Sequence, residues 1–328
     1  MILTSPLQQI HHPVFIKAKI TVMIKRDDLI HPIISGNKWR KLKFNITLAK
    51  QQNKKGIVSF GGAYSNHIHA LAFACYQQNI PCTAIIRGEA HYQNNFTLSW
   101  ARHWGMSLVF VDRATYKKRH EVAYLQTLQA EYVDHLIIPE GGSNAHALKG
   151  MGEVIAELNQ QTSFDTLITP VGSGGTLAGL ITADNDQHQL LGIAVLKSST
   201  SLNTIETSEL HSCRYLTEQV KKLLPDKSKK YNQWEILSDF HRGGYAKFSA
   251  ADCQRIIDFN KITQLTFEPV YSGKMILALL DLIALGYFPE HHRIVLLHTG
   301  GLQGLGGLAE RNIIDGDMWQ IPDNAPDV

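Results

Sequence analysis

TLITPVGSGGT, residues 166–176, joins a short apolar run to a glycine-rich turn and then to the start of a helical pattern. The same order recurs along the chain, because short apolar runs alternate with longer segments of helical periodicity. Strands that alternate with helices predict an α/β fold with parallel strands, and continuous apolar strands are typical of sheets covered on both faces. The predicted strands are residues 57–60, 82–86, 107–111, 135–138, 166–169, 190–196 and 294–297, and the predicted helices are 66–78, one around 93–104, one within 116–131, 145–159 and one from about 176.

The composition is that of a globular protein, and it excludes several functional classes. The chain has 328 residues, of which 44% are apolar and 19% charged, which is enough for a core and for about two domains. A net charge of +3, evenly spread, does not indicate a nucleic acid or a membrane surface as partner. Scattered cysteines without a CxxC pair, a start without a signal-peptide pattern and the lack of an apolar run of about 20 residues predict a cytoplasmic location.

The glycine-rich turn at residues 172–176 is a candidate anion site. Glycines let backbone N–H groups approach an anion, the following helix N-terminus favours negative charge, and Ser173 and Thr176 add hydroxyl groups. The spacing matches neither the dinucleotide fingerprint GxGxxG nor the nucleotide-binding motif GxxxxGK(S/T). A single phosphate monoester is therefore the predicted ligand, and a plain tight turn is the alternative.

A lysine near a predicted helix start is the second candidate. Lys38 follows the turn SGN at residues 35–37, and the helix macrodipole disfavours a cation at this position. A lysine that acts as a neutral amine gains from that field because its pKa falls, and neutral lysine amines form Schiff bases with carbonyl cofactors. The alternative is a surface lysine in a basic helix that also carries Arg40, Lys41 and Lys43.

Further motifs place polar groups where predicted strands end or helices begin. In GGAYSNH, residues 61–67, Ser65 or Asn66 can cap the next helix. EPVYSGK at 268–274 opens a helix, HTGG at 298–301 ends the last strand, and RGGY occupies 242–245. Because α/β sheets bind ligands at the carboxyl ends of their strands, these motifs are candidate site residues, with helix capping and turn formation as the structural alternative.

One lysine near a helix start, one phosphate cup and several polar strand ends together describe a site for pyridoxal 5′-phosphate (PLP). With these motifs the chain resembles the fold-type-II PLP enzymes, specifically the group of 1-aminocyclopropane-1-carboxylate (ACC) deaminases and D-cysteine desulfhydrases. The resemblance runs from about residue 6 to residue 307. The motifs that carry it are KRDDL (25–29), SGNKWRKL (35–42), FGGAYSNH (60–67), GSGGT (172–176), EPVYSGK (268–274) and HTGG (298–301).

The resemblance implies a two-domain fold similar to the tryptophan synthase β-subunit, with mostly parallel sheets and helices on both faces. The larger, PLP-holding domain is expected from residues 1–48 and 149–328, and a smaller domain, residues 49–148, is expected as an insertion. The active site is expected in the cleft between the domains, where closure of the small domain excludes water. The resemblance also implies a homodimer and a small-molecule amino acid substrate.

Residue roles follow by position from the same resemblance. It implies that Lys38 holds PLP as a Schiff base and moves the α-proton, and that Asn66 hydrogen-bonds the ring hydroxyl O3′. It places Ser65 near the substrate, to bind the carboxylate or assist proton transfer. Tyr271 is expected next to the ring and the substrate, and Tyr245 over the pocket. The remaining implied cofactor-binding residues are Gly172, Ser173, Gly174, Gly175 and Thr176 at the phosphate and Thr299 in the strand-end motif.

Two residues favour one of the group's two activities. Opening a cyclopropane ring is hard, and a carboxylate against the pyridine nitrogen would keep the cofactor a stronger electron sink. ACC deaminases have a Glu directly after the tyrosine and a Leu in the strand-end motif, whereas this chain has Ser272 and Thr299. Neutral hydroxyls suit β-elimination of a good leaving group such as a thiolate. We therefore expect a carbon–sulfur lyase that converts D-cysteine to pyruvate, ammonia and hydrogen sulfide, with ACC deaminase as the alternative.

Departures from the resembled pattern and a histidine pair keep further interpretations open. Tyr64, His69 and residues 242–246 differ from that pattern near the substrate, which leaves the exact amino acid undecided. His67 and His69 form an HxH pair that could belong to a zinc enzyme, although no HExxH or Cys/His spacing accompanies them. A non-catalytic PLP-binding relative would also retain Lys38, Asn66 and the GSGGT turn, and it would be a yellow protein without turnover.

Overall fold

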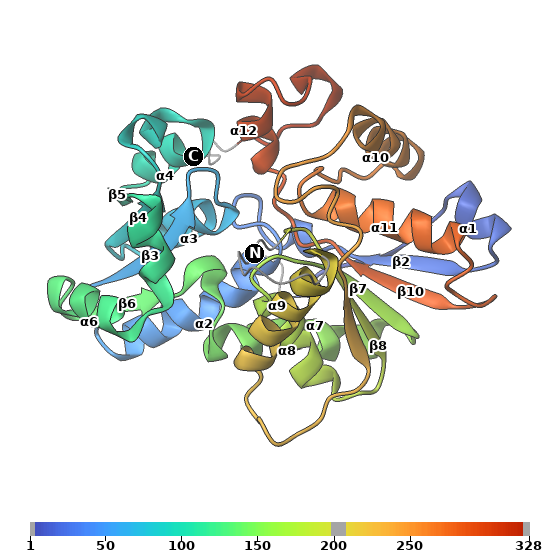
Figure 1. The fold of residues 1–328 in the computed structure, drawn as a ribbon, viewed down its shortest axis with the longest axis horizontal. Coiled ribbons are helices and arrows are strands. Elements are labelled where there is room, and N and C mark those ends of the chain that lie inside the picture. The colour runs from blue at the N-terminus through green and yellow to red at the C-terminus, as the bar shows by residue number, and fades with distance from the viewer. Residues whose placement is uncertain (1–3, 198–207, 324–328) are drawn as a thin grey trace.

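The computed structural model describes residues 4–197 and 208–323 and arranges them around two sheets (Figure 1). The larger sheet contains β1 (Leu7–Ile10), β2 (Thr21–Lys25), β7 (Thr166–Val171), β8 (Gln189–Ala194), β9 (Trp234–Leu237) and β10 (Arg293–Leu297). Its order is β1-β2-β10-β7-β8-β9, and only the β1–β2 pair is antiparallel within the described residues. The smaller sheet is parallel, in the order β5-β4-β3-β6, and contains β3 (Gly56–Gly62), β4 (Cys82–Arg87), β5 (Ser107–Val111) and β6 (His135–Ile138).

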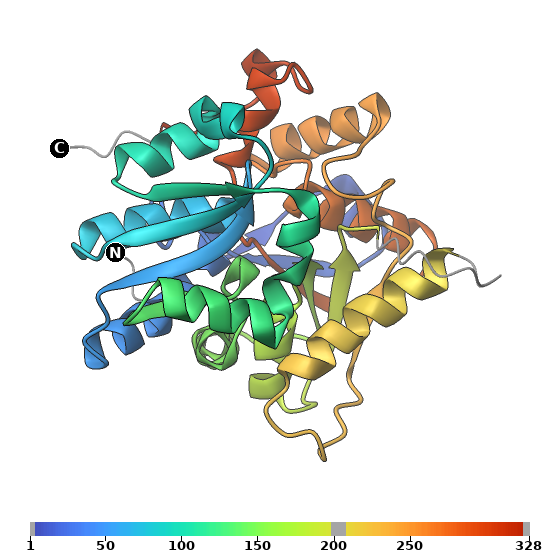
Figure 2. The ribbon, with the colours of Figure 1, turned by 60° about the vertical axis from the view of Figure 1, so that its left-hand side comes forward.

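Helices cover both faces of the larger sheet (Figures 1 and 2). One face carries α1 (Pro13–Lys17), α10 (Ala250–Thr263), α11 (Ser272–Ala284) and α12 (Gly304–Glu310), and the other carries α7 (Ala145–Gln161), α8 (Gly175–Asp184) and α9 (Ser208–Leu223). Successive strand residues face opposite cores, since Ile168 packs with the first set of helices and Leu167 with the second. The strands are continuously apolar because each is buried on both faces.

The smaller sheet is built in the same way. Helices α2 (Asn37–Gln51), α3 (Asn66–Gln77) and α4 (Phe96–His103) pack on one face, and α5 (Arg113–Lys117) and α6 (Val122–Glu131) pack on the other. Ile57 belongs to the first core and its neighbour Val58 to the second. Two double-sided sheets confirm the predicted α/β class with mostly parallel strands and helices on both faces.

Several element boundaries differ from those that periodicity predicts. The helix expected at 93–104 begins only at Phe96, because the side chain of Asn95 caps it by accepting the Leu98 N–H at 2.7 Å. The helix expected within residues 116–131 is α6, and a 3₁₀ turn at Lys118–His120 separates it from the short helix α5. No helix in the described ranges is long and apolar enough to span a bilayer.

The larger sheet joins distant parts of the sequence. Strand β2, near the N-terminus, pairs in parallel with β10, near the C-terminus, with Met23 opposite Val295. All strands of the smaller sheet lie between Gly56 and Ile138. This arrangement supports our proposal that residues 49–148 form an inserted domain between two segments of a larger one, and those boundaries stay a prediction.

A buried ion-pair network fixes α2 against the larger sheet. Arg40 donates to both carboxylate oxygens of Asp27 at 2.7 Å and to Oε1 of Glu157 at 2.7 Å, and the Arg40 side chain is only 2% exposed. Lys25 Nζ lies 2.6 Å from Glu157 and donates to the carbonyl oxygen of Ser5. Burial opposes ionisation of Glu157, but its bonds to the two cations dominate and lower its pKa. The network therefore links β2, α2 and α7.

Removing the arginine of this network should cost more stability than removing a surface cation. Arg40→Met leaves the buried Asp27 carboxylate without its partner, and we expect a loss of about 3–5 kcal/mol in the free energy of unfolding. Lys19→Met is the matched control, because Lys19 pairs with Glu290 on the surface and its loss should cost less than about 1 kcal/mol. Urea denaturation measures both variants, and equal losses would contradict the assignment.

Candidate active site

The predicted site residues converge on a cleft of about 1120 Å³ between the carboxyl ends of the two sets of strands. Its walls come from both sheets, since Gly62 ends β3, Arg87 ends β4 and Val171 ends β7. The site residues expected from the sequence that line it are Lys38, Ser65, Asn66, Gly172, Ser173, Gly174, Thr176, Tyr245, Tyr271 and Thr299. Gly175 is buried at the first position of α8, directly behind this wall.

Two backbone segments meet where α2 begins and thereby place Lys38. Gly36 precedes α2 with φ +72°, and a Cβ atom there would lie 1.9 Å from the carbonyl oxygen of Thr299. The Asn37 N–H donates to that same oxygen at 3.3 Å, and the Gly36 N–H donates to the Asp27 carbonyl at 2.9 Å. Only glycine fits this approach, because any side chain would meet the Thr299 backbone. Lys38 is therefore held beside the strand-end motif that follows β10.

The environment of Lys38 favours its neutral form. Its Nζ donates to Asn37 Oδ1 at 2.7 Å, and Asn37 Nδ2 in turn donates to Thr176 Oγ1 at 2.8 Å. Burial lowers the pKa of Lys38 to about 8, although the charge of Glu268 opposes the shift. Desolvation, and not the helix field alone, is thus the main cause of the predicted shift. A larger neutral fraction makes the amine a better nucleophile near pH 7.

The GSGGT turn forms a tight cup at the N-terminus of α8. Gly174 adopts a left-handed conformation with φ +82°, which turns the chain into the helix. A Cβ atom on Gly175 would lie 2.4 Å from Ser143 Oγ, so the position has room only for glycine. Ser143 and Ser173 share a hydrogen bond of 2.8 Å between their hydroxyl groups. Backbone N–H groups and hydroxyls thus face the cleft at a helix N-terminus, as an anion requires.

Lys41 is a site residue that sequence reasoning placed only in a basic helix. Its Nζ donates to the Gly141 carbonyl and to Ser143 Oγ, both at 3.2 Å, beside the GSGGT cup. Burial, helped by the charge of Lys38, lowers the pKa of Lys41 well below its usual value. No ion pair among the described residues involves Lys41. A bound anion would supply the missing counter-charge, and the signal in the sequence was the spacing of three residues from Lys38.

Two tyrosines form another part of the wall. The ring of Tyr271 lies close to Gly172, and the Tyr245 ring meets it edge-on with centroids 6.0 Å apart. Burial raises the pKa of both phenols, which keeps them neutral. The loop that carries Tyr245 is held by Lys274, whose Nζ donates to the carbonyl oxygens of His241 at 2.9 Å and Gly244 at 2.5 Å.

Ser272 and Thr299 occupy different environments. Thr299 lines the cleft, whereas Ser272 is fully buried outside the set of cleft-lining residues, and its hydroxyl donates to Glu268 Oε1 at 3.1 Å. Glu268 accepts the N–H groups of Val270, Tyr271 and Ser272 and so caps α11. Burial raises the Glu268 pKa to about 7, against the effect of these hydrogen bonds. Thr299 is therefore the member of the predicted hydroxyl pair that faces the cleft.

The segment after β3 leads into α3 and contains Ser65, Asn66, His67 and His69. Ser65 caps α3 by accepting the Ile68 N–H at 3.3 Å and still lines the cleft, so its capping and site roles coexist. His67 Nε2 lies 2.7 Å from Ser59 Oγ, and burial lowers the His67 pKa to about 3. His69 packs edge-on against the Trp104 ring. The described residues contain no group of three or more His, Cys, Asp or Glu side chains that could hold a metal ion.

The mouth of the cleft carries an excess of positive charge. Arg119 is paired with Glu140 at 2.7 Å, and Arg311 stacks over the Tyr64 ring at 4.0 Å. Such an excess favours anionic ligands, among them phosphates and carboxylates. The charged residues that line the cleft besides Lys38 and Lys41 are Arg87, Arg113, Arg119, Lys222, Lys247 and Arg311 on the basic side and Glu89 and Glu140 on the acidic side.

Known proteins are similar to this chain in sequence and in fold. A Pyrococcus abyssi protein provisionally named 1-aminocyclopropane-1-carboxylate deaminase is 30% identical over 298 residues, which cover 87% of this chain and 86% of the relative. A D-cysteine desulfhydrase from Serratia proteamaculans is 26% identical and covers 87% of each chain. The crystal structure of an ACC deaminase homologue superposes with a TM-score of 0.76 at 25% identity and covers 95% of this chain and 94% of the other.

The family assignment is independent of these individual relatives. The model of the family described as "Pyridoxal-phosphate dependent enzyme" matches residues 4–300. The match confirms the predicted fold-type-II fold and the predicted cofactor, PLP. The chain therefore belongs to the family of pyridoxal-phosphate-dependent enzymes.

Proposed function

We propose that this enzyme eliminates sulfide from D-cysteine, with pyruvate, ammonia and hydrogen sulfide as products and one water consumed. The observation that carries the proposal is Thr299, a neutral hydroxyl residue on the cleft wall where the resemblance puts a leucine in ACC deaminases. The nearby carboxylate of Glu268 is committed to the N-terminus of α11 and so does not offer its oxygens to the cleft.

Deamination of ACC is the second candidate. Relatives named for ACC deaminase and relatives named for D-cysteine desulfhydrase match this chain over similar lengths. An Arabidopsis thaliana relative, 27% identical over 304 residues, bears both names. Both candidates are PLP-dependent reactions of a small amino acid, so the choice between them concerns the substrate and not the site.

The residues of the cleft fit PLP at both of its ends. The GSGGT cup and Lys41 suit the phosphate, because N–H groups, hydroxyls and an unpaired buried cation meet there. Lys38, with a pKa of about 8, is the amine that would hold the aldehyde carbon. When bound, PLP supplies an electron sink for the negative charge that develops at the substrate's α-carbon.

The chain's own residues would then position the substrate and move its proton. Lys38 Nζ is the base we propose for the α-proton, since Lys38 lines the cleft and its pKa of about 8 gives it a larger neutral fraction than an ordinary lysine has. The N-terminus of α3, with Ser65 and Asn66, offers N–H and hydroxyl groups to the substrate carboxylate. Tyr271 and Tyr245, whose rings meet edge-on, limit the space beside Gly172.

A homodimer and a cytoplasmic location are further parts of this proposal. Both come from the resemblance and the composition of the chain. The free thiols of Cys75, Cys82 and Cys253 agree with a reducing compartment.

Lys38→Ala should abolish covalent retention of the cofactor. We expect the wild-type protein to show visible absorbance and, after borohydride reduction, a PLP-modified peptide that contains Lys38. Because only the neutral amine attacks a carbonyl, the initial rate of cofactor capture by apoprotein should rise with pH and level off above about 8. A Lys38→Ala variant with the same visible spectrum as the wild type would refute the assignment of the lysine.

The substrate is tested by measuring products from a panel of D- and L-amino acids and ACC. We expect sulfide and pyruvate from D-cysteine in equal amounts, and little 2-oxobutyrate from ACC. Turnover of ACC without turnover of D-cysteine would refute the proposed activity and support ACC deaminase instead. A yellow protein that turns over no member of the panel would favour the non-catalytic alternative.

Loosening the loop that carries Tyr245 should weaken catalysis without removing the cofactor. Lys274→Met deletes three hydrogen bonds to backbone carbonyls, and we expect kcat/KM to fall about 10- to 100-fold while visible absorbance is retained. Lys261→Met, at an exposed position on α10, is the matched control and should leave kcat/KM unchanged. An unchanged kcat/KM in the Lys274→Met variant would show that the loop needs no clamp.

A further inference from the structure

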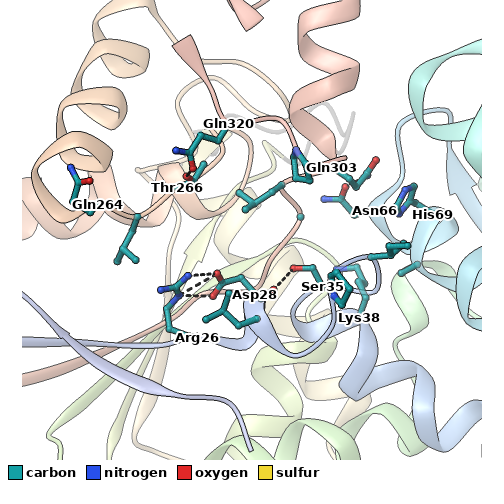
Figure 3. Close-up of a pocket in the computed structure, with 18 residues that line it drawn as sticks. Arg26, Asp28, Ser35, Lys38, Asn66, His69, Gln264, Thr266, Gln303 and Gln320 are labelled. Carbon is teal, nitrogen blue, oxygen red and sulfur yellow. Dashed lines mark hydrogen bonds and ion pairs between the residues drawn. The ribbon is translucent and has the colours of Figure 1, made fainter. Parts of the chain in front are cut away.

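Asn66 lies at the end of a short series of side-chain hydrogen bonds that connects α4, α12 and α3. We call this series, Thr97–Gln303–Asn66, the relay. Thr97, in the first turn of α4, donates through Oγ1 to Gln303 Oε1 at 3.3 Å. Gln303, at the N-terminus of α12, donates through Nε2 to Asn66 Oδ1. Figure 3 shows the side chains of Gln303 and Asn66 next to one another, with Lys38 near Asn66. The Gln303 side chain therefore connects a residue of α4 to a residue of α3.

The direction of the hydrogen bonds in the relay decides which end of the Asn66 amide, oxygen or nitrogen, remains free to bind a ligand in the cleft. The Thr97 hydroxyl occupies the oxygen of Gln303, so the Gln303 amide nitrogen is turned toward Asn66. That nitrogen can only donate, and it therefore selects the oxygen of Asn66. Within the described residues no hydrogen bond occupies Asn66 Nδ2, which makes this N–H group the polar atom left to a ligand.

The Thr97 end of the relay is buried, whereas the Asn66 end borders the cleft. Thr97 is fully buried and Gln303 is 7% exposed, so losing the hydrogen bond between them would leave a buried polar atom without its partner. Asn66 lines both the main cleft and an adjoining cavity of about 320 Å³. Gly301, with φ +90°, leaves the space that Asn66 Nδ2 needs, because a Cβ atom there would lie 2.8 Å from it.

We propose that Thr97 and Gln303 are positioning residues that present Asn66 Nδ2 as a hydrogen-bond donor to an anionic oxygen of the bound cofactor. This inference rests on the proposed function, which puts the cofactor beside Lys38 and Asn66. A wrongly turned Asn66 would aim its carbonyl oxygen at the same anion and repel it. The Asn66 contact thus depends on side chains up to two hydrogen bonds away.

The proposed relay has a spectroscopic consequence that is separate from turnover. A donor at an oxygen anion stabilises its negative charge and so weakens its hold on a nearby proton. Loss of the donor should therefore raise the pH at which the visible chromophore of the bound cofactor loses its proton. A hydrogen bond to a charged group corresponds to an upward shift of about one pH unit.

The experiment is a pH titration of the visible absorbance of the holoenzyme in matched variants. Gln303→Met removes both hydrogen bonds of the relay at similar volume, and Thr97→Val removes the hydroxyl that holds Gln303 in place. Both should raise the apparent pKa of the chromophore, whereas Thr97→Ser retains the hydroxyl and should titrate like the wild type. Gln303→Glu can only accept from Asn66, and it should give the largest upward shift.

Two comparisons separate orientation from other effects. If only the charged Gln303→Glu variant shifts the titration, a nearby charge explains the result and the relay is overturned. In an Asn66→Ala background Gln303→Met should cause no further shift, because the amide that it orients is absent. A full additional shift there would assign the effect of Gln303 to some other contact and overturn the relay as well.

Failure of the relay and failure of the proposed site give different results. A chromophore that depends on Lys38 but titrates alike in all Gln303 and Thr97 variants overturns the relay and leaves the proposed site intact. A chromophore that survives Lys38→Ala overturns the proposed site itself. Gln320→Met is a control in the adjoining cavity, since Gln320 bonds Thr266 and not Asn66, and its titration should match the wild type.

Discussion

The contact between the backbone at Gly36 and the backbone at Thr299 is the constraint on which the site depends. It joins the segment before α2 to the segment after β10, and both sides use glycine in the left-handed region, Gly36 at φ +72° and Gly300 at φ +69°. A Cβ atom on Gly300 would lie 2.4 Å from Ser35 Oγ, so the two turns interlock. Lys38 and Thr299 become neighbours because of this contact, although they lie near opposite ends of the chain.

Buried cations are the second recurring feature, and they serve different purposes. Arg40 and Lys25 are matched by the carboxylates of Asp27 and Glu157, so their charges hold elements together. Among the described residues, Lys274 Nζ hydrogen-bonds backbone carbonyl oxygens alone, and it clamps a loop. Lys41 also has only neutral partners among the described residues, and it lies next to a helix N-terminus. An unmatched buried cation at such a place is what an anionic cofactor would stabilise.

The fold could be predicted in part, and the errors have identifiable causes. The strands of both sheets that are apolar throughout, such as β3 and β7, were predicted close to their observed bounds. Strand β2 was missed because it ends in Lys25, whose burial depends on Glu157 far along the chain. Side-chain capping by Asn95 shortened one predicted helix.

The site could be predicted where a short sequence motif itself contains the functional groups. Lys38, Asn66 and the GSGGT turn are found in the cleft as expected. Lys41, Glu268 and Gln303 were not recognised, since each acts through a partner that is close in space and, for Lys41 and Gln303, distant in sequence. For Ser272 the resemblance implied a place at the cofactor ring, whereas the hydroxyl donates to Glu268.

The sequence by itself determined the alternation of strands and helices, the glycine turns and the lysine that we propose as the reactive one. These depend on local periodicity and on backbone conformations that few residues other than glycine adopt. Only the tertiary structure decided which charges are paired, which hydroxyls face the cleft and which end of Asn66 is free to donate. Those properties depend on burial and on hydrogen-bond partners brought together from distant segments, because desolvation and contact are properties of the packed molecule.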